Sequence, residues 1–430
     1  MSELHENDGA GLTGSALAGA GMVHPGVAGE VSAVMQGARI GRRTALVLVA
    51  AFWVLLIVPG VHQFIVEVGG SGAPAGRTGD VRQEWDLRRW GVLRLFEERP
   101  TRESLQRFEE DVGRESALGR AARVWYQTAM TRALRQGSEK VVVGRDGWLF
   151  YREEIDMAAG RGVLSAGEAG RHGADSIAAV VDFNEQLRAR GIKLIVVPVP
   201  AKPVIYPEKL WPGYPAAAGP AWNVDYAEWK QRINAAGVEV VDLTDALWAQ
   251  RASEPLYLRE DTHWSPAGME LAAGAVGRAV NKALGAHERV AYAERSREVV
   301  NHGDLYDMLE LRGGGEGERV TITEVRRDGK PAAGGDDAQV LLLGDSFANV
   351  YADAGLGWGS DAGLGAHVAL ATGTSVQVLA RNGAGATEVR RLLAARTGAM
   401  TDKKVIVWEF SARDLFDAGV TWERVVLPEP

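Results

Sequence analysis

From residue 177 onward, amphipathic segments of the chain alternate with short apolar runs. The segment 177–190 has apolar residues at helical spacing and ends at Gly191, a residue type typical of helix C-caps. The run 192–199 (IKLIVVPV) is continuous and β-branched, as buried parallel strands are. The same order of helix, glycine and strand repeats over 222–241. This alternation predicts an α/β fold with a doubly wound, mainly parallel sheet.

Further elements extend the pattern at both ends. Two β-type runs around a Gly-Arg-Asp-Gly turn predict a hairpin over 141–151. Ser265 followed by Pro266 predicts the start of a helix that ends near Leu284. The other elements that we predict are strands at 339–343, 376–379 and 405–410, a helix at 387–395, glycine-rich loops at 313–317 and 331–337, and a glycine-rich flank of the active site at 355–365.

The amino-terminal part of the chain does not show this alternation of helices and strands. Residues 1–43 are rich in small residues and predict a flexible tail on the cytoplasmic side. The stretch 44–66 is apolar and long enough to span a bilayer. A buried helix or the core of a cleaved signal peptide is the alternative, but the long preceding stretch favours an uncleaved anchor. Arginines at its amino-terminal end place the following residues outside, across a linker at 67–80. The domain predicted to be catalytic spans 81–425 and begins with helices.

Composition narrows the function classes. The 430 residues are 46% hydrophobic and 24% charged, which is typical of a globular protein with an ample core. The net charge of -8, without a basic stripe, argues against nucleic acid as a partner. The chain contains no cysteine, so disulfides, cysteine-zinc sites and thiol nucleophiles are excluded.

The candidate chemistry begins where the strand at 339–343 ends in Gly-Asp-Ser, which places Ser346 at the carboxyl edge of the sheet. Asp261 and His263 are two residues apart, so in an extended segment their side chains point to the same side. The carboxylate then orients one imidazole nitrogen and leaves the other to face Ser346. The backbone N–H of Ser346, at the start of a helix, can face a developing oxyanion.

Each of these residues also has a structural interpretation. Asp345 or Ser346 can be a helix N-cap, and His263 can simply stack on Trp264. The Asp261–His263 pair can also be part of a metal site, but the spacing of the other histidines does not suggest ligands. We therefore predict no metal and no cofactor.

Five motifs together resemble the periplasmic alginate O-acetyltransferase family, whose members have an SGNH-hydrolase-like domain. They are 144–150 (GRDGWLF), 197–202 (VPVPAK) with 206–208 (YPE), 261–265 (DTHWS), 344–347 (GDSF) and 407–410 (VWEF). The resemblance covers about residues 81–420 and implies a catalytic triad of Ser346, His263 and Asp261. In ordinary SGNH esterases the serine comes first, so the order seen here favours the acetyltransferase branch over a lipase.

Four further residues are candidates for the oxyanion hole or for substrate binding. Asn382 resembles the asparagine that SGNH folds supply to the oxyanion hole, although it also suits a turn. Arg413 can contact substrate or pair with Glu409 or Asp414, and Tyr351 can face the cleft or the core. Lys202 can bind an anionic sugar, although an exposed loop lysine is the alternative.

The resemblance implies an enzyme that takes an acetyl group as a serine ester and passes it to hydroxyls of an exopolysaccharide. It implies a membrane-embedded O-acyltransferase as the acetyl-donating partner. It also implies the membrane-anchored form without a carbohydrate-binding module, in the bacterial inner membrane with its catalytic domain in the periplasm. A carbohydrate O-acetyl esterase and a non-catalytic scaffold of a polysaccharide-export complex are the alternatives.

Overall fold

The computed structural model describes residues 137–160, 164, 168–311, 316–335, 337–417 and 420–429. The predicted tail, membrane anchor, linker and first helices, all within residues 1–136, lie outside the described residues. Among the described helices, none combines the length and the apolar character needed to cross a membrane.

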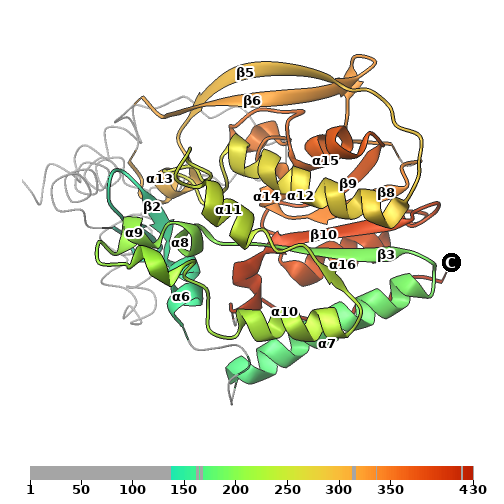
Figure 1. The fold of residues 1–430 in the computed structure, drawn as a ribbon, viewed down its shortest axis with the longest axis horizontal. Coiled ribbons are helices and arrows are strands. Elements are labelled where there is room, and N and C mark those ends of the chain that lie inside the picture. Colours follow the sequence, from blue (N-terminus) through green and yellow to red (C-terminus); the bar gives the residue numbers. More distant parts are fainter. Residues whose placement is uncertain are drawn as a thin grey trace, which may run out of the picture. The chain divides into compact units, whose positions relative to one another are not determined.

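The centre of the fold is a five-stranded sheet in the order β4-β3-β10-β8-β9, and all neighbouring strands are parallel (Figure 1). The predicted doubly wound parallel sheet is therefore confirmed. Its strands are β3 (Lys193–Val199), β4 (Glu239–Val240), β8 (Val340–Gly344), β9 (Val376–Ala380) and β10 (Val405–Ser411). Each lies at or within a few residues of its predicted position.

Helices cover both faces of this sheet, as Figure 1 shows. α12 (Pro266–Leu284) and α15 (Leu364–Thr372) pack on one face, and α7 (Glu168–Arg188), α10 (Tyr226–Ala235) and α16 (Ala386–Ala395) pack on the other. Successive strand residues alternate between the two cores: Leu342 joins the first, whereas Leu341 and Leu343 join the second. Because both faces are covered, the strands are mostly apolar, and β8 (VLLLG) is buried throughout.

The ends of the helices follow the predicted local chemistry. Ser265 caps α12, because its hydroxyl accepts a hydrogen bond from the backbone N–H of Gly268 at 3.2 Å. Pro266 takes the first helical position, where a missing N–H costs nothing. Gly191 follows α7 with φ of 72°, a conformation in which a side chain would be strained.

A second, antiparallel sheet of order β5-β6-β7 was not predicted from the sequence. Its strands are β5 (Ala293–Asn301), β6 (Glu318–Arg327) and β7 (Lys330–Pro331). β5 is largely exposed and charged, so it lacks the apolar run by which we recognised the central strands. The prediction of a loop beginning at Pro331 is wrong for that residue, because Pro331 pairs with Arg326.

The remaining elements are a β-hairpin and a set of short helices. The predicted hairpin is confirmed as β1 (Val141–Val143) paired antiparallel with β2 (Leu149–Tyr151). The short helices are α6 (Arg152–Ala159), α8 (Lys202–Ile205), α9 (Pro207–Leu210), η2 (Ala216–Ala218), α11 (Thr244–Gln250), α13 (Asp304–Met308), α14 (Ser346–Asn349), η3 (Ala354–Leu356) and η4 (Ala412–Leu415).

Two glycines of α12 provide a test of the packing against α15. A Cβ at Gly277 would lie 2.6 Å from Ala371 Cβ, whereas at Gly274 the nearest atom would be Arg278 Nη1 at 3.7 Å. Gly277→Ala should therefore lower the free energy of unfolding by about 1–3 kcal/mol through overpacking. Gly274→Ala should raise it by about 0.5–1 kcal/mol because alanine favours the helix. Denaturant titration followed by tryptophan fluorescence measures both, and equal effects would contradict the packing described here.

Candidate active site

Ser346 opens α14 directly beyond the carboxyl end of β8, at the edge predicted from the sequence. Asp345 is the N-cap of this helix, and its Oδ1 accepts from the backbone N–H of Phe347 at 2.7 Å. The N-cap interpretation of Asp345 is thus correct, and it leaves the neighbouring serine hydroxyl uncommitted to capping. Ser346 itself is partly exposed.

The Asp345 carboxylate also ties β8 to β10. Its Oδ2 accepts from the backbone N–H of Ser411 at 2.9 Å, and its own N–H donates to Glu409 Oε2 at 3.2 Å. Glu409 is fully buried, and burial together with the charge of Asp345 raises its pKa well above the usual range. A Cβ at Gly344 would lie 2.7 Å from Glu409 Oε2, so only glycine fits before the turn.

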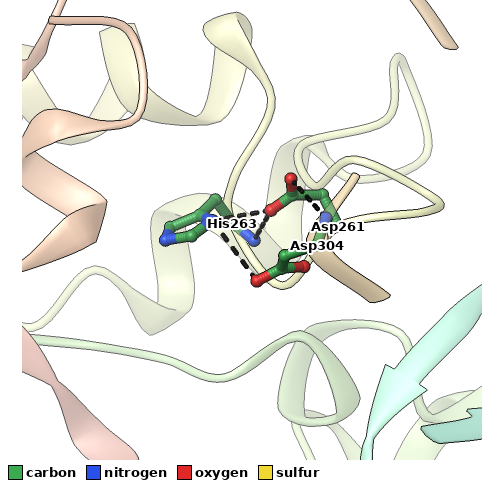
Figure 2. A group of neighbouring side chains, drawn as sticks. All are labelled: Asp261, His263 and Asp304. Atoms are coloured by element: carbon green, nitrogen blue, oxygen red, sulfur yellow. Dashed lines mark hydrogen bonds and ion pairs between the residues drawn. The ribbon is translucent and has the colours of Figure 1, made fainter. Parts of the chain in front are cut away.

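Asp261 and His263 form the contact that their spacing predicts, as Figure 2 shows. Asp261 Oδ1 lies 2.6 Å from His263 Nδ1 and also accepts from the His263 backbone N–H at 2.9 Å. Both residues are buried. Because an ionised carboxylate only accepts hydrogen bonds, Nδ1 carries the hydrogen and Nε2 is the free base.

Two groups remote in sequence complete the shell of Asp261. Its Oδ2 accepts from Trp358 Nε1 at 2.9 Å and from the backbone N–H of Asp304 at 3.2 Å. Trp358 is fully buried within the glycine-rich stretch predicted to flank the site. Gly303 permits this approach, because a Cβ there would lie 2.4 Å from the Cβ of Asp261.

The segment that carries His263 is held on both sides. Asp304 accepts from the Thr262 backbone N–H at 2.8 Å and from its hydroxyl at 2.6 Å. Trp264 donates from Nε1 to the carbonyl of Phe347 at 3.1 Å, which joins this segment to the turn that carries Ser346. Trp264 therefore fixes the histidine segment relative to α14, and Thr262 fixes it relative to α13.

Burial and neighbouring charges shift the pKa values of Asp261 and His263 in opposite directions. Burial disfavours the charged form of Asp261, but the positive charge of His263 and its hydrogen bonds outweigh it and hold the pKa of that carboxyl well below its usual range. Burial likewise lowers the pKa of His263, but the adjacent Asp261 outweighs it, so the net shift is upward. Burial and the nearby Asp261 charge raise the pKa of Asp304.

Asp261, His263 and Asp304 are close enough together to be considered as metal ligands (Figure 2). The candidate ligand atoms already take part in hydrogen bonds within the protein, however. His263 Nδ1 faces Asp261 at 2.6 Å, and both oxygens of Asp304 accept from Thr262. The hydrogen bonds of these three side chains therefore suit an oriented base better than a cation.

The structure brings His263 next to the Ser346 turn without a hydrogen bond between the two side chains. The His263 ring lies 4.7 Å from the Phe347 ring, centroid to centroid. His263 Nε2 is buried and has no hydrogen-bond partner among the described residues. A base with a free nitrogen thus packs against Phe347, the residue after the serine, and catalytic hydrogen bonds of this kind often tighten only when substrate binds.

Asn382 and Tyr351 have different placements. Asn382 is exposed on the turn after β9, where its Nδ2 donates to Asp353 at 2.7 Å and its Oδ1 accepts from Asn349 at 3.0 Å. Tyr351 is fully buried, and its hydroxyl donates to the carbonyl of Trp264 at 2.8 Å. Of the two placements that the sequence left open for Tyr351, the structure shows the core, where the side chain supports the histidine segment rather than contacting substrate.

The prediction of a sugar-binding Lys202 is also wrong. Its side chain is fully buried, and Nζ donates to the carbonyls of Leu149 at 2.6 Å and Arg259 at 3.3 Å. Burial lowers the pKa of Lys202 to about 8 despite the nearby Glu154. This lysine joins β2 to the segment before Asp261 and is out of reach of a polymer.

Arg413 pairs neither with Glu409 nor with Asp414 among the described ion pairs. Its Nη1 lies 3.3 Å from Oε1 of Glu154, a fully buried residue of α6. Glu154, Asp304 and Trp358 were not identified from the sequence. None of the three belongs to the motifs recognised in the sequence, and only the fold shows which groups they contact.

Trp358→Phe tests the shell of Asp261. The variant removes one donor from a buried carboxylate and leaves a small void, so the free energy of unfolding should fall by about 2–4 kcal/mol at neutral pH. Trp211→Phe is the matched control, because Trp211 is exposed, and it should change stability by less than about 0.5 kcal/mol. Comparable effects of the two substitutions in denaturant titrations would rule out the assigned hydrogen bond.

Comparison with known proteins agrees with the motifs. Residues 141–412 match the family model described as an SGNH hydrolase-like domain, acetyltransferase AlgX. The chain is 30% identical to the probable alginate O-acetylase AlgJ of Pseudomonas aeruginosa, over 65% of this chain and 71% of that protein. It is 33% identical to the protein of the same name in Pseudomonas syringae pv. tomato, over 41% of this chain and 43% of the relative.

A solved structure supports the same assignment. The O-acetyltransferase domain of Pseudomonas putida AlgJ superposes with a TM-score of 0.51 at 25% identity, over 64% of this chain and 91% of that one. The described fold, the order of the motifs and the family model thus agree. The chain belongs to the family of SGNH hydrolase-like acetyltransferases represented by AlgX and AlgJ.

Proposed function

We propose that this acetyltransferase moves an acetyl group through an ester on Ser346 to hydroxyl groups of alginate or a closely similar uronate polysaccharide. The observation that carries the proposal is the buried Asp261–His263 pair, whose free Nε2 stands beside the turn that begins with Ser346. The names of the relatives, probable alginate O-acetylases, supply the polymer.

The chemistry follows from the roles of the three residues. His263 Nε2 removes the proton of Ser346 Oγ as the oxygen attacks the carbonyl carbon of the acetyl donor, and the imidazolium returns that proton to the leaving group. In the second half, Nε2 takes the proton of a sugar hydroxyl as its oxygen attacks the acetyl carbon of the serine ester. The bond from that carbon to Ser346 Oγ breaks, the imidazolium returns the proton to Oγ, and the acetylated sugar leaves. Asp261 keeps the imidazole in the required tautomer and stabilises its charge.

Two donors are assigned to the oxyanion. The first is the backbone N–H of Ser346, because the next one, at Phe347, is already bonded to Asp345. The second is Asn382, because one hydrogen of its amide is bonded to Asp353 and the other remains for a ligand. In this proposal one backbone group and one side-chain group together form the oxyanion hole.

The location and partner of the enzyme belong to the same proposal. The uncharged stretch 44–66 and the arginines before it favour a single-span anchor in the inner membrane, with the catalytic domain in the periplasm. Activated acetyl groups come from the cytoplasm, so a membrane-embedded O-acyltransferase is the donor that we propose.

Ser346→Ala tests the nucleophile. The variant should lose transfer from a chromogenic acetate ester to an oligouronate by a factor of at least about 10³, because the acyl intermediate cannot form. Ser296→Ala, on the exposed strand β5, is the matched control and should retain activity. Mass spectrometry of the acceptor separates a transferase, which adds acetyl groups, from an esterase, which releases only acetate. Retained transfer by Ser346→Ala would refute the nucleophile.

The pH dependence tests the base. Because Asp261 raises the pKa of His263, the imidazole loses its proton only above the ordinary histidine range. Activity should therefore rise with pH, and its midpoint should lie above about 6.5. Asp261→Asn removes the opposing charge, so the midpoint should move to lower pH and the maximal rate should fall by about 10²–10⁴-fold. If the midpoint of the pH profile were the same in Asp261→Asn as in the wild type, His263 would not be the base that Asp261 orients.

A further inference from the structure

A second charged group lies at the edge of the sheet that carries Ser346. Arg413 is in η4, which begins directly after β10, and β10 is the neighbour of β8. The backbone N–H of Ser411, two residues earlier, donates to Asp345 at 2.9 Å. Arg413 therefore starts from the same corner of the sheet as the nucleophile.

The guanidinium of Arg413 contacts two residues, Glu154 and Tyr151. Its Nη1 lies 3.3 Å from Glu154 Oε1, and its central carbon lies 5.5 Å from the centre of the Tyr151 ring. The side chain of Glu154 is 0% exposed, whereas that of Arg413 is 22% exposed. Glu154 is thus completely buried, whereas part of the Arg413 side chain is exposed to solvent.

Glu154 is an unusual residue to bury for stability alone. Its Oε2 is buried and has no hydrogen-bond partner among the described residues. Burial raises the pKa of Glu154 to about 7, against the opposing charges of Arg413 and Lys202. The Nζ of Lys202 already donates to two backbone carbonyls. Replacing a buried ion pair by apolar residues is often neutral or stabilising, so stability alone does not account for this carboxylate. Its direct cation is Arg413.

Arg413 retains capacity for a ligand. An arginine has five N–H donors in a planar fork, and the described contacts with charged groups use Nη1. Burial would lower its pKa, but Glu154, Asp414 and Asp345 outweigh that effect, so the residue stays charged. A planar fork matches a carboxylate in two parallel hydrogen bonds.

We propose that Arg413 binds a sugar carboxylate of the acceptor, and that Glu154 and Tyr151 are positioning residues that orient its guanidinium. This inference rests on the proposed function, in which the acceptor is a uronate polymer. The carboxylate would then set the register of the polymer, so that a neighbouring hydroxyl meets the ester on Ser346. Arg413 in this view determines specificity for acidic over neutral polysaccharides.

The experiment compares two acceptors of equal length, an oligouronate and its carboxyl-reduced neutral counterpart, with the full chain. Arg413→Gln should raise KM for the oligouronate by roughly 10- to 100-fold, because a charge-assisted hydrogen bond is lost. KM for the neutral acceptor should stay at the wild-type value. Arg413→Lys should fall between the wild type and Arg413→Gln, because an ammonium keeps the charge but lacks the fork.

Arg391→Gln is the matched control. Arg391 is an exposed residue of α16 that pairs with Glu388, so its loss should affect neither acceptor. An equal rise of KM for both acceptors in Arg413→Gln would show a purely structural role and would overturn the inference. An unchanged KM for the oligouronate would overturn it as well.

Glu154→Gln tests the positioning role. It keeps the shape of the side chain but removes its charge, so KM for the oligouronate should rise while kcat with the neutral acceptor is retained. A loss of kcat with both acceptors would assign Glu154 to the stability of the site instead.

Binding separates this inference from the proposed function. Calorimetry with the oligouronate is carried out on Ser346→Ala and on Ser346→Ala combined with Arg413→Gln. Weaker binding in the double variant supports the carboxylate site even if the wild type transfers no acetyl group, an outcome that would refute only the proposed function. Equal binding by the two variants overturns the inference even if transfer is efficient.

Discussion

The buried carboxylate of Asp261 is the group on which the site depends. Burying a charge costs several kcal/mol unless it is fully hydrogen-bonded. Four donors meet this requirement, from two positions in His263, from Trp358 and from the backbone of Asp304. They come from three separate segments of the chain, so satisfying one carboxylate brings those segments together. The same contacts fix the ring of His263 and leave Nε2 free.

A second buried carboxylate links the strands. Asp345 caps α14 through one oxygen and accepts from the backbone of β10 through the other, so the nucleophile turn is attached to the neighbouring strand. Trp264, through its bond to the carbonyl of Phe347, connects this turn to the histidine segment. The serine and the base are thus positioned by backbone contacts of their neighbours rather than by contact with each other.

The roles of Lys202 and Arg413 cannot be deduced from their residue types alone. Lys202 is a structural cation bound to backbone carbonyls, although its motif suggested sugar binding. Arg413 is also a cation, but its side chain is paired with the carboxylate of Glu154 and stays partly exposed. Burial, not residue type, distinguishes a lysine that supports the fold from an arginine available to a substrate.

The sequence by itself determined the parallel sheet, the hairpin before it and the pairing of Asp261 with His263. These features rest on local periodicity, on turn residues and on a spacing of two, all of which are readable over a few residues. Only the tertiary structure decided which remote groups complete the site. Trp358 lies in a stretch that the sequence marks only as a glycine-rich flank, and Asp304 and Glu154 lie outside the recognised motifs. Strand β5 is polar because most of its residues are exposed. The placements of Tyr351 and Lys202 were likewise decided only by the fold, since the burial of a side chain depends on contacts between distant segments.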